Sequence, residues 1–283
     1  MKLIPLALAL GLLVFAPLLM TLVLGLFRFD GLAAPQWLGW AAYQRMLDDA
    51  LFQQSLRNSL LIAALSIPLR LLLALGLSLL LQRPGRASRA ALLISLLPVV
   101  VPTLVWATAW LWLLNPHFGP IAAALDSWRV NGASWLLSAE GARSSLILIL
   151  GVLAGELLLI LVVARRQIPQ AWYDLAALEG VSRLGQFRLI SLPLMAPIIA
   201  LLAARDFAMT FQTSFIPAQI VTKGGPQFMS TMLPQYVYEN SFEYLRFGYA
   251  ATLSSAMLAI TLVVLVPQAL LLWHWLKRDD NPA

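Results

Sequence analysis

Residues 165–197 read RRQIPQAWYDLAALEGVSRLGQFRLISLPLMAP, and they interrupt a chain that is strongly apolar on both sides. Pro169 suits the first position of a helix, where its missing N–H costs nothing. Gly180 suits the residue just past the C-terminus of that helix, and Ser182 suits the N-cap of a second helix. Because the stretch is too polar to cross a membrane, it predicts a helix–turn–helix hairpin at a membrane surface.

The segments around this hairpin have the composition of a membrane protein. Of 283 residues, 60% are hydrophobic and 11% are charged, whereas soluble domains have about 45–50% and about 25%. A membrane-spanning helix needs about 20 apolar residues. The sequence therefore predicts an all-α membrane protein with six transmembrane helices, with the hairpin between the fourth and the fifth. The predicted spans are residues 3–27, 55–81, 90–114, 144–164, 197–221 and 247–276.

These spans divide the chain into three regions. Residues 1–54 form the first transmembrane helix and an outer loop, residues 55–276 form the core transmembrane domain, and residues 277–283 form a cytoplasmic tail. The apolar run at 3–27 is longer than the core of a cleavable signal peptide, which has about 7–15 residues. It is therefore predicted to be an uncleaved helix.

Basic residues are unevenly distributed between the two sides of the predicted membrane. With the N-terminus inside, the inner segments hold ten Lys/Arg and four Asp/Glu, whereas the outer segments hold seven of each. The clearest inner segment is the turn QRPGRASR at residues 82–89. Since cytoplasmic loops carry an excess of Lys and Arg, both termini are predicted to be cytoplasmic.

Several kinds of site are excluded by composition. The chain has no cysteine and only two histidines, His117 and His274, so thiolate sites and histidine-rich metal sites are not expected. The formal charge of +6 is explained by basic cytoplasmic loops, and nucleic-acid binding is not expected.

The hairpin segment resembles the coupling segment of ATP-binding-cassette importer permeases. The family pattern is Ile-Pro, then Tyr-Glu-Ala-Ala, Asp-Gly-Ala, Phe-x-x-Ile-x-Leu-Pro and a further Pro four residues later. Here Asp174 replaces Glu, Leu175 replaces the first Ala and Glu179 replaces Asp, so the charge is kept at both acidic positions. The matching positions are Ile168-Pro169, Tyr173 to Ala176, Glu179 to Val181, Phe187 to Pro193, and Pro197.

The resemblance continues outside the hairpin and narrows the type. Residues 29–59 resemble the loop after the first helix in permeases of the maltose and glycerol-phosphate type. Thr222-Lys223-Gly224-Gly225-Pro226 resembles the Thr-x-Gly-Gly-Pro loop of that type, and residues 236–251 resemble its run into the last helix. The resemblance therefore implies a carbohydrate-uptake permease.

This family implies a set of partners and contacts. The partners are a second homologous permease, a dimer of ABC ATPases, an extracytoplasmic solute-binding protein and a sugar or sugar-like solute, in a bacterial or archaeal plasma membrane. The chain has no Gly-rich Lys-Ser/Thr phosphate loop, so ATP and Mg²⁺ are expected on the ATPase, and this chain is expected to be neither an enzyme nor a cofactor carrier. The expected ATPase-coupling residues are Tyr173, Asp174, Leu175, Ala176, Glu179 and Gly180.

Ionisable residues inside the predicted spans are further candidates, because charge in lipid is costly and marks function by default. They are Arg70, Glu156, Arg205 and Asp206. Adjacent residues do not face each other on a helix, so Arg205 and Asp206 are each expected to find a separate partner. Arg70 with Glu156 is a candidate pair at mid-membrane. Structural ion pairs and a role in the path both remain open.

The fifth span adds residues suited to a sugar path, since sugars stack on aromatic rings and bind a few polar groups. The expected path residues are Arg205, Phe211, Gln212, Phe215 and Gln219. Ordinary helix packing is the alternative for all of them. Pro98 and Pro102 in the third span mark either a kink that lines a path or a packing bend.

Three other classes of protein share parts of this pattern. A secondary transporter would usually show an internal repeat, and none is found. An importer permease for amino acids, peptides or polyamines does not explain the Gly-Gly-Pro loop. An intramembrane enzyme is disfavoured because residues 180–185 lack the Gly-x-Ser-x-Gly spacing and no His-Glu-x-x-His is present. The identity of the solute is left open.

Overall fold

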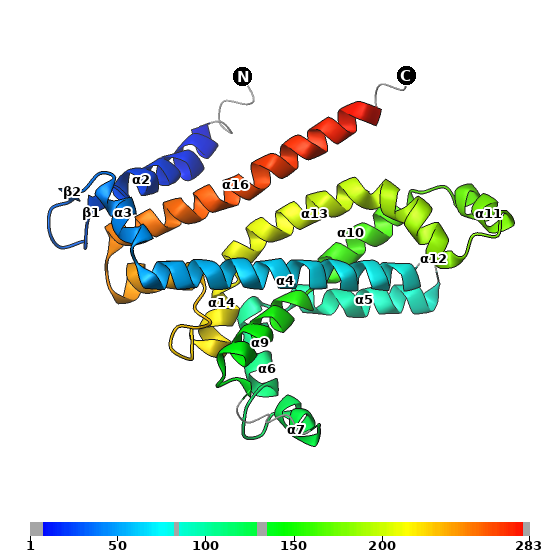
Figure 1. Ribbon diagram of the computed structural model, residues 1–283, viewed down its shortest axis with the longest axis horizontal. Helices are drawn as coiled ribbons and strands as arrows, with labels where there is room; N and C mark the ends of the chain where they lie inside the picture. Colours follow the sequence, from blue (N-terminus) through cyan, green and yellow to red (C-terminus); the bar gives the residue numbers. More distant parts are fainter. Residues whose placement is uncertain (1–7, 82–84, 129–134, 280–283) are drawn as a thin grey trace.

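The helices form one elongated bundle with a side projection (Figure 1). The computed structural model describes residues 8–81, 85–128 and 135–279. The helices that build the bundle are α4 (Ala50–Leu80), α5 (Arg86–Val100), α10 (Gly155–Arg166), α13 (Leu192–Thr213) and α16 (Phe247–Asp279). The helices of the projection are α6 (Thr103–Leu113), α7 (Pro120–Ser127) and α9 (Ala139–Gly151).

Three stretches of helix are long and apolar enough to cross a membrane as they stand. They cover residues 50–80, 183–211 and 247–275, and two bent helix pairs would raise the number to five. The first apolar helix is described from Leu8 to Leu24, and this described part is shorter than a membrane-spanning helix needs to be. The predicted all-α membrane fold is thus confirmed, whereas the predicted count of six helices is not matched in full.

The predicted third span is the pair α5 and α6, which meet at an angle of 99°. Val101 and Pro102 separate them, and both have extended backbone, with ψ of 128° and 138°. A residue before proline is disfavoured in helical conformation, and proline cannot donate the next helical hydrogen bond. Pro102 therefore ends the straight span, whereas Pro98 lies inside α5.

The predicted fourth span is also broken, into α9 and α10, which meet at 43°. The break falls after Gly151, and Ala154 closes a tight turn by donating its N–H to the carbonyl of Val152 at 2.8 Å. Carbonyl groups at a helix end lack partners in their own helix. This break supplies an acceptor inside the bundle, the carbonyl of Leu150, which Arg70 uses (below).

Helix α4 runs through the middle of the bundle and presents small residues to its neighbours. In a membrane, close packing of small residues contributes more to helix association than burial of apolar surface. Helices α9, α10 and α13 all contact α4. The small residues buried along α4 are Ser55, Ser59, Ala63, Ser66, Ala74 and Ser78.

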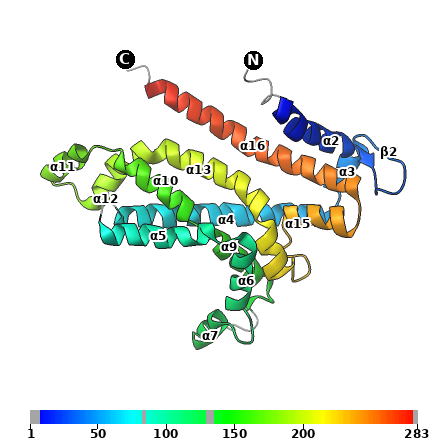
Figure 2. The same cartoon turned by 180° about the vertical axis from the view of Figure 1, so that it is seen from behind.

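The two ends of the bundle differ. One end carries α2 (Ala16–Leu24), the hairpin of β1 (Phe27–Arg28) and β2 (Gln36–Trp37), and α3 (Ala41–Leu47). The other end carries α11 (Gln170–Leu178) and α12 (Arg183–Gln186), as Figures 1 and 2 show from opposite sides. The outer loop predicted after the first span is thus a folded unit at the end opposite the α11–α12 hairpin.

Asp49 fastens the start of α4 at the β-hairpin end. Its Oδ1 accepts the N–H of Leu51 at 2.9 Å, which makes it the N-cap. Its Oδ2 accepts the hydroxyl of Tyr236 at 2.5 Å and the hydroxyl of Tyr249. Burial opposes ionisation of this carboxyl, but the hydrogen bonds from the two tyrosine hydroxyls and from the backbone N–H groups of Leu51 and Phe52 together hold the pKa of Asp49 below its ordinary value. One carboxylate therefore joins α4 to α15 (Leu233–Tyr238) and α16.

Replacing Asp49 by alanine is expected to lower the free energy of unfolding by about 2 kcal/mol or more. An N-cap contributes about 1 kcal/mol, and each tyrosine hydroxyl left without its partner adds about 1–3 kcal/mol when buried. Asp48→Ala is the matched control. Asp48 is exposed and does not cap α4, because Asp49 does. Thermal unfolding in detergent measures both, and equal losses in the two variants would contradict the assignment.

The same carboxylate predicts how stability depends on pH. A lowered folded-state pKa stabilises the protein above the unfolded-state pKa, and that contribution is lost as the pH falls through the folded-state value. The loss of stability on acidification should therefore be smaller in Asp49→Ala than in the unmodified chain, as thermal unfolding measured at several pH values would show.

Candidate functional site

The hairpin predicted from residues 165–197 is present and has defined ends. Helix α11 follows Pro169 and ends at a left-handed Gly180 with φ of +77°. Gly180 donates its N–H to Ala177 at 3.1 Å, and Val181 donates to Ala176 at 2.9 Å, the pattern of a glycine C-terminal motif. Ser182 then caps α12 by accepting the N–H of Gly185 at 3.3 Å.

The outer side of this hairpin is unusually apolar for an exposed helix. No residue of α11 is buried, and Leu175 and Leu178 are 62% and 85% exposed. Asp174, Glu179 and Gly180 are also exposed, whereas Tyr173 and Ala176 are half-buried toward the bundle. Exposed apolar groups gathered with charged ones are typical of a protein-binding surface.

The inner side of α11 is hydrogen-bonded to the segment that leads into α13. The hydroxyls of Tyr173 and Ser191 are 2.8 Å apart, and Ser191 ends the π-helical turn η2 (Phe187–Ser191). The side-chain amide of Gln186 donates to the carbonyls of Tyr173 and Val181, both at 3.3 Å. The guanidinium of Arg165 lies 6.0 Å from the Tyr173 ring. Tyr173 therefore serves as the internal attachment of α11.

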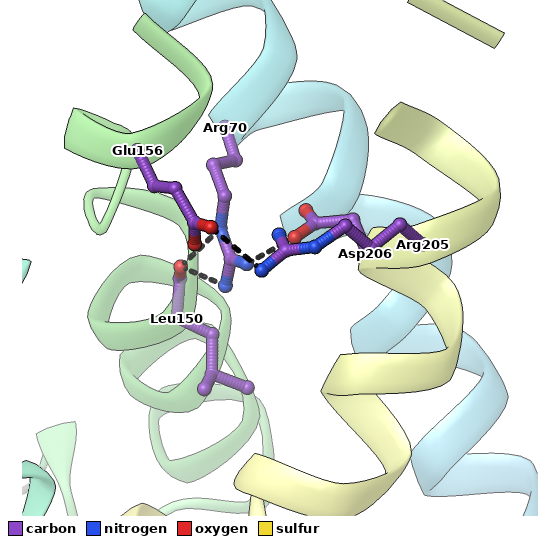
Figure 3. A network of polar contacts seen from close by, with 5 residues as sticks. All are labelled: Arg70, Leu150, Glu156, Arg205 and Asp206. Carbon is purple, nitrogen blue, oxygen red and sulfur yellow. Dashed lines mark hydrogen bonds and ion pairs between the residues drawn. The ribbon is translucent and has the colours of Figure 1, made fainter. Parts of the chain in front are cut away.

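Figure 3 shows how the charged residues inside the bundle pair. Arg70 on α4 contacts Asp206 on α13 at 2.6 Å, and both side chains are buried. The same guanidinium donates Nε and Nη2 to the carbonyl of Leu150 at 3.0 and 2.5 Å. Arg70 on α4 is thereby joined both to α13 and to the end of α9, where the fourth span is broken. The candidate pair of Arg70 with Glu156 was wrong, because the free carbonyl and Asp206 occupy the guanidinium.

Glu156 instead pairs with Arg205, at 2.7 Å. This pair joins α10 to α13, and its side chains are 39% and 47% exposed for Arg205 and Glu156. The expectation that Arg205 and Asp206 find separate partners is confirmed, since the two side chains leave α13 toward different neighbours (Figure 3). The described part of the bundle thus contains one buried ion pair and one ion pair that is open to its surface.

The expected path residues of the fifth span separate into different environments. Phe211 is 2% exposed and packs with Phe52, Leu233 and Leu253, so in this conformation it is a core residue and does not line an open surface. The side chain of Gln212 lies outside the described part of the chain. Phe215 and Gln219 are half-buried and lie on α14 (Phe215–Pro217) and the π-helical turn η3 (Ala218–Thr222).

Phe215 and Gln219 belong to a larger cluster, named here the aromatic–amide cluster. The ring centroids of Phe215 and Tyr238 are 4.7 Å apart, and those of Tyr238 and Phe242 are 5.0 Å apart. Beside these rings, the amide of Gln235 donates to Gln219 at 2.9 Å and to Glu239 at 3.2 Å. Burial, with the nearby charge of Glu243, raises the pKa of Glu239. The cluster combines neighbouring aromatic rings, tilted by about 40° to one another, with planar polar groups.

Sequence reasoning missed four members of the aromatic–amide cluster. Gln235 and Glu239, like Tyr238 and Phe242, are four residues apart on α15 and η4 (Glu239–Glu243). That spacing places each pair on one helix face and was the available signal. Their contact with Phe215 and Gln219 depends on tertiary packing, which spacing does not give.

The loop Thr222 to Pro226 lies beside this cluster. Gly224 has φ of +75°, and a Cβ at that position would lie 2.4 Å from Oγ1 of Thr231. Any other residue would therefore be strained there. The first glycine of the Gly-Gly-Pro pattern thus has a local structural cause. Among the described residues, no cluster of His, Cys, Asp and Glu is suited to holding a metal ion.

Breaking the buried pair is expected to cost much more stability than breaking the exposed one. Arg70→Met leaves Asp206 buried without its counter-ion, at a cost of about 3–5 kcal/mol, whereas Arg205→Met should cost about 0–1 kcal/mol. The double variant Arg70→Met/Asp206→Leu should recover part of the loss, because no unpaired charge remains. Thermal unfolding of the three proteins in detergent measures this. Equal losses in the two single variants would contradict the distinction.

Comparison with known proteins adds three kinds of similarity. The model of the family described as "Binding-protein-dependent transport system inner membrane component" matches residues 67–273. The sulfoquinovosyl glycerol transport system permease protein SmoG of Agrobacterium fabrum is 28% identical, over 92% of this chain and 85% of that protein. The sn-glycerol-3-phosphate transport system permease protein UgpA of Rhizobium meliloti is 27% identical, over 80% and 77%.

A solved structure supports the fold. A chain of a bacterial ABC transporter involved in the import of the acidic polysaccharide alginate superposes with a TM-score of 0.80 and 19% identity. The match covers 96% of this chain and 94% of that one. Because the family model spans most of the sequence and includes both the broken helices and the hairpin, the chain belongs to the family of inner membrane components of binding-protein-dependent transport systems, the ABC transporter permeases.

Proposed function

We propose that this chain is one of two permease subunits of an ATP-driven importer for a sugar or sugar-like solute. The observation that carries the proposal is the exposed apolar hairpin α11–α12, hydrogen-bonded on its inner side to the start of α13. The names of its relatives support the solute class, since they refer to sulfoquinovosyl glycerol and glycerol 3-phosphate. The other subunits of the proposed complex are a second permease, an ABC ATPase dimer and an extracytoplasmic solute-binding protein.

The proposed orientation places both termini and the α11–α12 hairpin in the cytoplasm. There the exposed residues Leu175, Leu178 and Gly180 face the ATPase, which binds the ATP and Mg²⁺. A solved alginate transporter bound to its periplasmic protein is similar in fold to this chain, and this supports docking of a solute-binding protein at the opposite end. The chain itself supplies no nucleotide site in this scheme.

Closure of the ATPase would displace α11 as a rigid element. The Tyr173–Ser191 contact and the Gln186 amide attach α11 to η2 and hence to α13, so a displacement of α11 also moves α13. Helix α13 carries Arg205 and Asp206 and leads into Phe215. Rigid-body motion of packed elements is an established way to alternate access. Movement of the hairpin would therefore reach the residues proposed to line the path.

The proposed path includes Arg205, Phe215 and Gln219, which the sequence suggested, and extends to Tyr238, whereas Gln235 is buried behind them. The aromatic rings give a sugar an apolar face to lie on, and the Gln219 amide and the Glu239 carboxyl can hydrogen-bond its hydroxyls. Phe211 has no contact role in this path while it remains in the core.

Gly180→Asp is expected to leave the protein inserted and folded but to uncouple ATP hydrolysis from transport. No atom lies within 4 Å of a Cβ at this position, and Asp tolerates left-handed backbone better than most residues, so the added charge acts mainly on the docking partner. Uptake in cells and crosslinking of the ATPase to α11 measure the effect.

Ser182→Asp is the matched control for added charge. Aspartate is a good N-cap, and position 182 is also exposed but lies beyond the proposed contact residues. It should retain most uptake. Normal uptake by Gly180→Asp, or equal loss in the two variants, would count against the proposed contact.

Tyr238→Ala is expected to reduce solute uptake about threefold to tenfold, because an aromatic contact contributes about 0.5–1.5 kcal/mol. Tyr238→Phe retains the ring and should stay close to the unmodified protein. Initial uptake rates over a range of solute concentrations, at equal protein in the membrane, distinguish the two. If both variants transport normally, the ring is not in the path.

A further inference from the structure

A basic cavity lies at the end of the bundle opposite the α11–α12 hairpin. It has a volume of about 530 Å³ and is enclosed by residues 27–30, by α3 and by the start of α16. Three arginines line it, namely Arg28, Arg45 and Arg246. They come from segments far apart in the sequence, so the cavity exists only in the folded chain.

None of the three guanidinium groups forms an ion pair with a described residue, since the two ion pairs found there involve Arg70 and Arg205. Arg246 lies 5.5 Å from the Tyr244 ring, a contact that leaves its N–H groups free to donate. The three guanidinium groups are exposed and have no close carboxylate partner among the described residues, so their N–H groups are available to a bound anion.

The two acids in the cavity already accept hydrogen bonds from other groups, although backbone N–H groups and, to a lesser degree, the charge of Arg28 lower the pKa of Asp30. Asp30 accepts the backbone N–H groups of Leu32 and Ala33 at 3.0 and 2.9 Å. Asp49 accepts from Leu51 and from two tyrosine hydroxyls, as described above. With three cations against two hydrogen-bonded carboxylates, the cavity has surplus positive charge and is suited to an anion.

An apolar groove adjoins this cavity. It has a volume of about 610 Å³ and is lined along α2 by Leu19, Val23 and Leu24. Phe27 and Phe29 line both the groove and the cavity, so the apolar surface continues into the basic one. Trp37 and Trp40 are exposed nearby in sequence, and exposed tryptophans gather where a membrane meets water.

We propose that the cavity and the groove together bind an anionic phospholipid, the phosphate on the arginines and an acyl chain along α2. Guanidinium groups match phosphate oxygens in geometry and charge, and a groove of leucine, valine and phenylalanine matches a hydrocarbon chain. Free inorganic phosphate shares the head-group chemistry but leaves the groove unused. The lipid fills both surfaces and would help to hold α2 against α16, whose Thr252 donates to the carbonyl of Gly25 at 2.7 Å.

The test uses the full chain, purified in detergent and depleted of lipid. Phosphatidylglycerol is added in mixed micelles, with phosphatidylcholine and inorganic phosphate as separate arms. Native mass spectrometry measures retained lipid, and the shift in Tm measures stabilisation. The unmodified protein should retain phosphatidylglycerol and gain stability, with weaker effects from phosphatidylcholine and from phosphate.

Two kinds of variant separate the head group from the chain. Arg28→Gln/Arg45→Gln/Arg246→Gln should lower retention of phosphatidylglycerol by at least about tenfold, since the charge-assisted hydrogen bonds to the phosphate are lost. Val23→Trp fills the groove and should also lower lipid retention while leaving any effect of phosphate unchanged. Arg57→Gln is the matched control. Arg57 lies near the start of α4 but does not line the cavity, so its replacement removes one positive charge without changing the proposed site.

The proposal is overturned if the triple variant retains phosphatidylglycerol as well as the unmodified protein does. It is also overturned if phosphate stabilises the protein as much as the lipid does and Val23→Trp changes nothing, because the site would then take a free anion. The single variant Arg45→Gln repeats the measurement of lipid retention with one arginine removed instead of three. Tm without lipid confirms that each variant is folded.

Discussion

The arrangement of the bundle depends on the buried guanidinium of Arg70. It contacts Asp206 on α13 and the carbonyl of Leu150 at the end of α9, so one side chain from α4 fixes two other helices. These contacts pair the Leu150 carbonyl and the Asp206 carboxylate, which would each be costly inside a membrane without a partner. The break between α9 and α10 is therefore part of the same feature, because a continuous helix would have used the Leu150 carbonyl itself.

The second ion pair of the bundle acts under different physical conditions. Arg205 and Glu156 are part-exposed. Where they face the proposed aqueous path, water or a solute can compete with their attraction, and the pair can open at little cost. Adjacent positions on α13 thus carry one residue locked in the core and one available at the surface. Because α13 begins at the segment that holds α11, the same helix joins the hairpin to both pairs.

The two ends of the molecule present opposite kinds of surface. At the hairpin end, α11 exposes apolar residues between acidic ones, which suits a protein partner. At the other end, three arginines that form no ion pair with a described residue border an apolar groove beside the first helix, which suits a lipid. Between them, the aromatic–amide cluster brings together rings and hydrogen-bonding groups from α14, η3, α15 and η4.

The sequence alone determined the membrane class, the hairpin and its ends, because these depend on composition and on local signals such as Pro169, Gly180 and Ser182. It also indicated that Arg205 and Asp206 need separate partners, since adjacent residues point apart on a helix. The two prolines of the third span also indicated a bend there, but its angle of 99° came from the structure. Only the tertiary structure decided which charges pair, that Phe211 is buried, and that the fourth span is bent. Those outcomes depend on where distant segments meet: Arg70 pairs with Asp206, 136 residues away, and no periodicity within one helix encodes that contact.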